Sequence, residues 1–404
     1  MAAGLGFKDF VTGEVLTAAD VDGYLMQGVW VFADATARDA AVTSPQEGNT
    51  CYLKDTDAVM TYSGSAWVTA NSPASYGLSA GKNAIINGSM DIVQRGTNFP
   101  ITLNTTTYTL DRWCARRGAN GETITQQDTS DNTNLPFLKK CLRIQRNSGD
   151  TTTTLMSISQ SLETINSTLF AGKTITVSYY ARRGANYSAT SNAFNCDVYT
   201  GTGTSENVAL GYTGSAVSGQ VLATLTTTWQ RFSGSVNIPS TATEIGLYFN
   251  YTPTGTAGAA DFVEITGVQL ELGTTVTDFS RNGSTFQNEL AACQRYYYRI
   301  SSSASNLYAY MTPSGSASSS TSAAAVAVFP VQMRVVPTSL DFANLALTDN
   351  AANFAVSALT LNTATGSNLG MTLTATSTGL TTSRFYFLVA NNSSSAYLGL
   401  SAEL

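Results

Sequence analysis

At 404 residues the chain is long enough for roughly two or three domains, and only 12% of its residues are Asp, Glu, Lys or Arg. Its net charge of -6 provides no basic surface for phosphates, which argues against a nucleic-acid partner or insertion into an anionic membrane. It contains no histidine, which excludes Ser-His triads and zincin-type chemistry.

The abundant Thr, Val, Tyr and Phe fit half-buried strands, and the abundant Gly, Asn and Ser fit turns, so we expect a mostly β protein. Five cysteines are odd in number and widely spaced, which predicts buried free thiols and neither a disulfide framework nor a metal site. No cofactor is expected. Lys8 and Asp9 interrupt the N-terminal apolar run, so we expect synthesis in a cytoplasm without Sec-type export.

Residues 1–70 are predicted to form a small α+β module. Thr17 with Asp20 and Thr36 with Asp39 resemble capping boxes, which predicts helices near 18–26 and 36–42. VWVFAD (29–34) reads as a strand, and TCYLKDTDAVMTYSGSAWV alternates as a meander that turns at DTD and SGS. Residues 71–82 are rich in Ser, Ala and Gly and are typical of a linker.

Residues 83–281 are predicted to form a jelly-roll-like β-sandwich, because strand-length segments recur between Gly- and Asn-rich turns. The segments are LRIQR, TITVSYYARR, CDVYTG, WQRFSGSVNI, EIGLYFNY and FVEITGVQLEL. Period-2 alternation sends Ile175, Val177 and Tyr179 to one face, and Ile245, Leu247 and Phe249 likewise. These six side chains are predicted to face the core.

Residues 282–404 are predicted to form a second β-sandwich. The region starts with the aromatic run QRYYYRI, in which at least two of the tyrosines are expected in the core or at an interface. The Ser-Ala stretch that follows lies between apolar segments, which favours a loop inside this sandwich over a disordered linker.

Several motifs resemble, in order, those of modular bacteriophage tail-fibre proteins with a carbohydrate-binding jelly roll. In the jelly roll they are NAIINGSMDIVQRG, YTLDRW, ISQSLE, AGKTITVSYYAR, TWQRFSGSVNIP and GVQLELG. VTDFS, ELAACQRYYYRI and FPVQMRVVPT are similar to the junction and C-terminal domain of such proteins, and LTAADVDGYLMQG and YLKDTDAVMTYSGSAW to phage tail segments. The resemblance implies a homotrimeric virion protein with sugar-binding potential. The region beyond about residue 340 shows no such resemblance.

Sugars bind proteins through stacking on aromatic faces and through amide, carboxylate and guanidinium groups. The candidate glycan-binding residues are those predicted on polar strand faces: Tyr180, Arg182, Asp197, Tyr199, Tyr248, Asn250 and Glu264. The alternative is that the tyrosines pack against a loop or a neighbouring subunit. Arg95, Asp111 and Arg112 are read either as a ligand subsite or as ion pairs at the sandwich edge, and Trp113 as a core anchor.

No catalytic residues are expected. The best carboxylate candidates are Glu163, Asp261 and Glu264, but Asp261 and Glu264 are three apart in a predicted strand and should point to opposite faces. The leading hypothesis is therefore a non-catalytic phage tail-fibre subunit, located in the virion tail, whose N-terminal region docks onto tail or baseplate proteins and whose sandwiches bind host-surface polysaccharide. The alternatives are a purely structural virion component (head fibre, capsid decoration, tail collar or baseplate protein) and a glycan-degrading tailspike.

Overall fold

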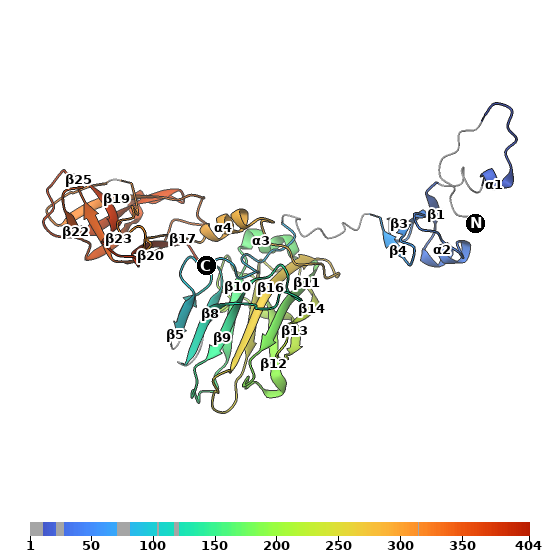
Figure 1. Ribbon diagram of the computed structural model, residues 1–404, viewed down its shortest axis with the longest axis horizontal. Coiled ribbons are helices and arrows are strands. Elements are labelled where there is room, and N and C mark those ends of the chain that lie inside the picture. Colours follow the sequence, from blue (N-terminus) through green and yellow to red (C-terminus); the bar gives the residue numbers. More distant parts are fainter. Residues whose placement is uncertain (1–10, 22–27, 71–80, 103–104, 117–120, 314) are drawn as a thin grey trace. The chain divides into compact units, whose positions relative to one another are not determined.

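The computed structural model describes residues 11–21, 28–70, 81–102, 105–116, 121–313 and 315–404. The chain divides into two compact units, residues 1–76 and 77–404, and this division falls within the predicted linker. Strands far outnumber helices along the chain, which confirms the predicted fold class (Figure 1).

The first unit contains a four-stranded sheet of order β1-β2-β3-β4, and its described residues also form the short helices α1 and α2. Thr17 and Asp20 form the predicted capping box, whereas the predicted extension of that helix to residue 26 lies outside the described residues. The predicted cap of the second helix was wrong: Asp34, not Thr36, accepts the Ala37 N–H, at 2.8 Å. The elements are α1 (Ala18–Asp20), β1 (Trp30–Phe32), α2 (Ala35–Ala41), β2 (Thr50–Leu53), β3 (Ala58–Tyr62) and β4 (Trp67–Thr69).

The second unit begins with a sandwich of two six-stranded sheets, as predicted. The first sheet, in spatial order, contains β13 (Ala216–Thr224), β12 (Ala193–Gly201), β15 (Glu244–Tyr251), β10 (Met156–Ser161), β7 (Cys114–Arg116) and β6 (Thr106–Tyr108). The second contains β14 (Gln230–Asn237), β11 (Thr174–Arg183), β16 (Phe262–Leu272), β9 (Lys140–Arg146), β8 (Glu122–Asp128) and β5 (Asn98–Ile101). The connecting turns include α3 (Thr164–Ser167), η2 (Thr168–Phe170) and η3 (Thr190–Asn192).

Apolar side chains from both sheets form one core, and all six side chains predicted to face it are buried there. An aromatic cluster lies at its centre: the Phe249 ring contacts Tyr179 edge-on, with 5.0 Å between centroids, and stacks on Phe194 at 5.9 Å. Trp113, the predicted anchor, is fully buried and donates its Nε1–H to the Asn87 carbonyl at 3.0 Å. Burying each large side chain contributes about 1.5–3 kcal/mol.

A bulge in β16 changes the alternation that the sequence shows. The register between β11 and β16 shifts at Ser178–Tyr180, and Gly267 has a φ of +60°. Val263 and Ile265 face the core before the bulge, and Val268 and Leu270 face it afterwards. The bulge thus keeps both halves of an eleven-residue strand packed on one core.

The rest of the second unit is a smaller sandwich with its own core. Its three sheets have the orders β17-β26-β20, β18-β25-β21-β22 and β19-β24-β23. The Ser-Ala stretch lies inside this sandwich, as predicted, but only residues 317–321 form a loop: Ser322–Val328, which was predicted to belong to that loop, is strand β19 and pairs with β24. The nine-residue α4 was not predicted, because its segment, which ends just before the tyrosine run, has little helical amphipathicity. The elements are α4 (Phe286–Gln294), β17 (Tyr297–Ser301), β18 (Gly315–Ser316), β19 (Ser322–Val328), β20 (Ser339–Ala343), β21 (Leu345–Thr348), β22 (Asn353–Ala355), β23 (Ala358–Asn362), η4 (Thr363–Thr365), β24 (Gly370–Thr376), β25 (Phe385–Ala390) and β26 (Tyr397–Ser401).

Ion pairs connect the two sandwiches of the second unit. Arg95 and Arg112 both pair with Glu403, which follows β26. Asp111 does not pair with them as predicted: its carboxylate accepts hydrogen bonds from the backbone and side chain of Gln94, at 2.6 and 2.5 Å. The ion pairs therefore lie between the sandwiches and not at the edge of one.

All five cysteines (Cys51, Cys114, Cys141, Cys196 and Cys293) are buried and free, as predicted. Within the described ranges, no three His, Cys, Asp or Glu side chains gather as a metal site would require. The same part of the chain contains no helix that is both long and apolar enough to cross a membrane.

Candidate functional site

The seven candidate residues do not form one platform. Asp197 and Tyr199 on β12 and Tyr248 and Asn250 on β15 lie on the outer face of the first six-stranded sheet. Tyr180, Arg182 and Glu264 lie on β11 and β16, on the outer face of the opposite sheet. The core separates the two groups, so they can serve at most two separate sites.

We call the first group, together with Asn195 and Gln220, the β12–β15 face. Strand pairing places side chains of neighbouring strands directly opposite one another, in rows that run across the strands. Gln220 on β13, Asp197 on β12 and Tyr248 on β15 form one such row. In the next row, Asn195 on β12 lies directly opposite Asn250 on β15. Because side chains in such rows are about 5 Å apart, these groups can contact one ligand together.

Asp197 is the hydrogen-bonding centre of this face. Its Oδ1 accepts the Gln220 Nε2–H and its Oδ2 accepts the Asn250 Nδ2–H, both at 2.7 Å. Asp197 and Asn250 are both buried. The two amides thus satisfy the carboxylate and hold all three side chains in fixed orientations.

Tyr199 and Tyr248 form an aromatic pair on the same face. Their rings meet edge to face, with 5.7 Å between centroids, and both side chains are half-buried. Burial, followed by neighbouring charged or phenolic groups, raises the pKa of each phenol above its usual range. Both hydroxyls are therefore neutral at physiological pH and can donate as well as accept hydrogen bonds.

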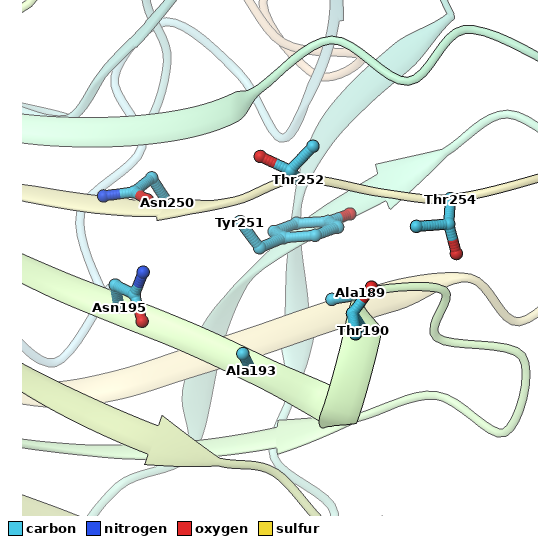
Figure 2. Close-up of a pocket in the computed structure, with 8 residues that line it drawn as sticks. All are labelled: Ala189, Thr190, Ala193, Asn195, Asn250, Tyr251, Thr252 and Thr254. Atoms are coloured by element: carbon cyan, nitrogen blue, oxygen red, sulfur yellow. The ribbon is translucent and has the colours of Figure 1, made fainter.

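A hollow of about 250 Å³ lies at one end of this face. Figure 2 shows Asn195 and Asn250 on neighbouring strands at its border, and the Tyr251 ring in its middle. The opposite wall is the tight turn η3, in which Ser191 and Asn192 have φ values of 57° and 55°. Amide, hydroxyl and ring groups thus line one small concave site.

The loop between β12 and β13 closes the other end of the face. Gly246 on β15 leaves room for it, since a Cβ there would lie 2.5 Å from the Tyr212 hydroxyl and 2.9 Å from Val208 Cβ. The buried Glu244 carboxylate holds the loop by accepting the Glu206 N–H at 2.5 Å. The open part of the face is therefore bounded by this loop and by η3.

The opposite sheet carries a fully buried carboxylate between two arginines. Glu264 Oε1 accepts Arg143 Nε–H and Nη2–H at 2.8 and 2.6 Å, and its Oε2 accepts Arg182 Nε–H at 2.5 Å. The Arg143 guanidinium lies 4.0 Å from the Phe262 ring centroid, and that of Arg182 lies 5.0 Å from Trp229. These groups brace one another, as expected for a structural ion-pair network.

Tyr180 packs against a loop, which was the alternative prediction for the tyrosines. It packs against a small cluster in which Leu135 and Leu138, from the segment between β8 and β9, meet Cys141 of β9 and Trp229, which precedes β14. The Arg231 guanidinium lies 5.5 Å from its ring centroid. Tyr180 is therefore half-buried against a loop and lies apart from the β12–β15 face.

The three candidate catalytic carboxylates are all paired with arginine. Arg295 donates to both Glu163 oxygens, at 2.8 and 2.9 Å. Asp261 pairs with Arg146 at 3.0 Å, and Glu264 with Arg143 and Arg182. Asp261 and Glu264 have no common partner, so they do not share one site.

Asn195 and Gln220 were missed by the sequence analysis. Asn195 lies two residues before Asp197, so period-2 alternation would have placed it on the same face had the strand not been started at Cys196. Gln220 lies on β13, whose first half alternates weakly because Ser218 and Gly219 interrupt it. No local signal in that strand identifies Gln220.

Comparisons with known proteins place this chain in no family. No protein-family model matches it, and no curated protein does either. Solved structures with a similar fold include the xylan-binding CBM22-1 domain of Paenibacillus barcinonensis Xyn10C, at 14% identity and a TM-score of 0.30 over 49% of this chain and 98% of that one.

A second similar structure is the C-terminal family 22 carbohydrate-binding module of Clostridium thermocellum Xyn10B, at 15% identity and a TM-score of 0.29, covering 44% of this chain and 100% of that one. A third is the enzymatically active domain of bacteriophage CBA120 tailspike protein 4, at 10% identity and a TM-score of 0.28, over 48% of this chain and 22% of that one. Similarity at these levels says nothing about the function of this chain, which depends on its own side chains.

Proposed function

We propose that this chain is a non-catalytic bacteriophage tail-fibre subunit that attaches the virion to its host by binding surface glycan through the β12–β15 face. The observation that carries the glycan proposal is the combination on one rigid sheet of a tyrosine pair with a carboxylate held by two amides. Aromatic rings cover the C–H faces of sugars, while fixed amides and hydroxyls pair with sugar hydroxyls. The tail-fibre assignment is supported by the order of the sequence motifs.

The absence of catalysis is part of this proposal. Each candidate carboxylate is already engaged by arginine, and a paired carboxylate is a weak general base. A glycan-degrading tailspike would instead need two carboxyl groups facing one bond, roughly 5–9.5 Å apart.

The fibre is proposed to be a homotrimer, with the N-terminal unit docked onto other tail or baseplate proteins. Strand β19 is a sheet edge and exposes Val326 and Val328, at 41% and 59%. An edge strand with exposed apolar side chains is a template on which another chain can pair. Mass measurement of the full chain at micromolar concentration is expected to give three copies per particle, and a stable monomer would contradict this part of the proposal.

The glycan site is tested with the full chain on an array of purified bacterial O-antigens and capsular polysaccharides. Tyr199→Ala and Tyr248→Ala are each expected to weaken binding about threefold to tenfold, because one aromatic contact contributes ~0.5–1.5 kcal/mol. Tyr308→Ala is the matched control, since Tyr308 is exposed at 49% in the second sandwich. Circular dichroism and the thermal midpoint check that each variant is folded.

Three outcomes separate the alternatives. Retention of a polysaccharide by the wild type and its loss in the tyrosine variants supports attachment through this face. Absence of binding by the wild type favours a purely structural virion component. Release of reducing sugar from a bound polysaccharide would show a glycan-degrading tailspike.

A further inference from the structure

A second hollow, of about 410 Å³, lies between the two sandwiches of the second unit. Strand β6 contributes one wall, and β17, β20 and β26 contribute the other. We call it the junction hollow and define it by Arg95, Tyr108, Tyr297, Arg299, Asp341 and Tyr397, which all line it. It lies apart from the β12–β15 face, none of whose residues line it.

Two arginines are fixed on tyrosine rings in this hollow. The guanidinium carbon of Arg95 lies 3.6 Å from the Tyr297 ring centroid, and that of Arg299 lies 3.6 Å from Tyr397. Arg299 Nη1 donates to the Arg95 carbonyl at 3.0 Å, and its Nε donates to Ser301 Oγ at 3.1 Å. Stacking and hydrogen bonds thus orient both planar groups before any ligand arrives.

Each of these two guanidinium groups has one nitrogen without a hydrogen-bond acceptor among the described residues. Among the described residues, no hydrogen-bond acceptor is found for Arg299 Nη2, while its Nε and Nη1 are both engaged. Arg95 Nη2 lies 3.2 Å from Glu403, but Arg95 Nη1 is buried without a partner. Arg95 Nη1 is enclosed by the protein, so the donor that faces an incoming anion is Nη2 of the half-buried Arg299.

The charges around the hollow also favour an anion. The Tyr297 hydroxyl lies within hydrogen-bonding distance of both oxygens of the Asp341 carboxylate, at 3.0 and 3.1 Å. Glu403 is shared by Arg95 and Arg112, and Asp111 is held by Gln94. The charged residues that line the hollow are Arg95, Arg299 and Asp341, and Arg95 is already paired with Glu403. Arg299 makes no ion pair among the described residues, so its positive charge remains for a ligand.

We propose that the junction hollow binds a carboxylate-bearing sugar residue of an acidic polysaccharide. Arg299 donates to the sugar carboxylate in a charge-assisted hydrogen bond, and the half-buried Tyr108 and Tyr397, which line the hollow, contact the sugar ring. Hydroxyl groups of the ligand face Asp341, which lies on the same wall and in the same row as Arg299, across Gly399 of β26. The binding of acidic sugars here does not depend on glycan binding at the β12–β15 face, because the two sites share no residue.

The test compares acidic oligosaccharides with their methyl esters, in which the carboxyl group loses its charge and gains one methyl group. The full chain is titrated calorimetrically with oligogalacturonate, oligoglucuronate and oligomannuronate, and with the three esters. At least one acid is expected to bind about tenfold more tightly than its ester, with a preference that weakens as salt is added. Equal affinity for acid and ester, or no binding of any acid at millimolar concentration, overturns the proposal.

Arg299→Gln is expected to abolish the preference for the acid. Arg384→Gln is the matched control, since Arg384 pairs with Asp349 at 3.0 Å elsewhere in the same sandwich. An equal loss in both variants would show that binding reflects surface charge alone and would overturn the proposal.

Ser339→Tyr is a second variant that leaves the ion pairs intact. Ser339 is exposed and lines the hollow, so a tyrosine there is expected to block it and to reduce acid binding. Tyr248→Ala is expected to leave acid binding unchanged, which separates a failure of this proposal from a failure at the β12–β15 face. Acid binding that survives in both Arg299→Gln and Ser339→Tyr would place the ligand elsewhere and refute the assignment.

Discussion

The guanidinium of Arg112 pairs with the carboxylate of Glu403, and this buried contact joins the two sandwiches of the second unit. Arg112 also lies 3.5 Å from the Tyr296 ring centroid and donates through Nη2 to the Ser161 carbonyl at 2.7 Å. It has a φ of +70°, which is uncommon for a side chain of this size. One residue thus connects three segments that are far apart in the sequence.

Arg112→Met is expected to lower the free energy of unfolding by about 3–5 kcal/mol, because it leaves Glu403 buried with less compensating charge. The measurement is equilibrium denaturation in urea. Glu403→Gln in the same background should recover part of the loss, and a double-mutant cycle gives the coupling. Strictly additive losses would show that the pair does not couple the sandwiches.

Arg146→Met is expected to cost a similar ~3–5 kcal/mol. The fully buried Arg146 pairs with Asp261 at 3.0 Å and donates through Nη2 to the carbonyls of Asp150, Thr152 and Gly255 at 2.7–3.0 Å. Arg384→Met removes an arginine whose side chain is 49% exposed, and it should change stability by no more than about 0.5 kcal/mol. Similar denaturation midpoints for the two variants would contradict this reading of Arg146.

Glu244→Gln is expected to stabilise the protein at neutral pH. Burial raises the pKa of Glu244, and the adjacent Glu206 carboxyl raises it further. Between the ordinary carboxyl pKa of about 4.3 and the raised folded value, the folded state holds more protons, so stability falls as pH rises through this window. Glutamine cannot ionise, so the stability difference between variant and wild type should grow from pH 4 to pH 7.

Glu206→Gln is expected to have the opposite effect and to lower stability at neutral pH. Hydrogen bonds from the Thr213 N–H and hydroxyl lower the pKa of Glu206. The ionised Glu206 carboxylate stabilises the folded state above the ordinary carboxyl pKa, and this stabilisation is lost as the pH falls through the lowered pKa of the folded state. The variant should therefore be less stable than the wild type at neutral pH. Thermal midpoints across pH measure both effects, and parallel profiles for the two variants would refute the assignment.

Gly88→Ala is expected to destabilise the first sandwich by ~1–3 kcal/mol. A Cβ at Gly88 would lie 2.2 Å from the Val268 carbonyl oxygen, which is backbone and cannot move aside cheaply. Gly28→Ala is the control, because no atom lies within 4 Å of the corresponding position. Thermal unfolding of the two variants gives the comparison, and an unchanged midpoint for Gly88→Ala would show that the contact relaxes.

Much of the fold follows from local patterns. The strands β11, β15 and β16 match the predicted segments residue for residue, because period-2 alternation and flanking turn residues define both their ends and their inward faces. Helix α4 could not be predicted in this way, since tertiary packing of Glu289 and Cys293, both buried, stabilises a weakly amphipathic segment.

In β11 and β15 the sequence by itself determined which side chains point inward and which point outward, because the two-residue repeat is unbroken there, whereas in β16 the bulge at Gly267 changes it. The sequence placed Tyr180 and Tyr248 correctly on the outward faces of their strands. Only the tertiary structure decided that these faces belong to opposite sheets, that a loop covers Tyr180, and that Asp197 lies between Gln220 and Asn250. The physical reason is that strand pairing joins residues far apart in the chain, and no local repeat specifies which strands become neighbours.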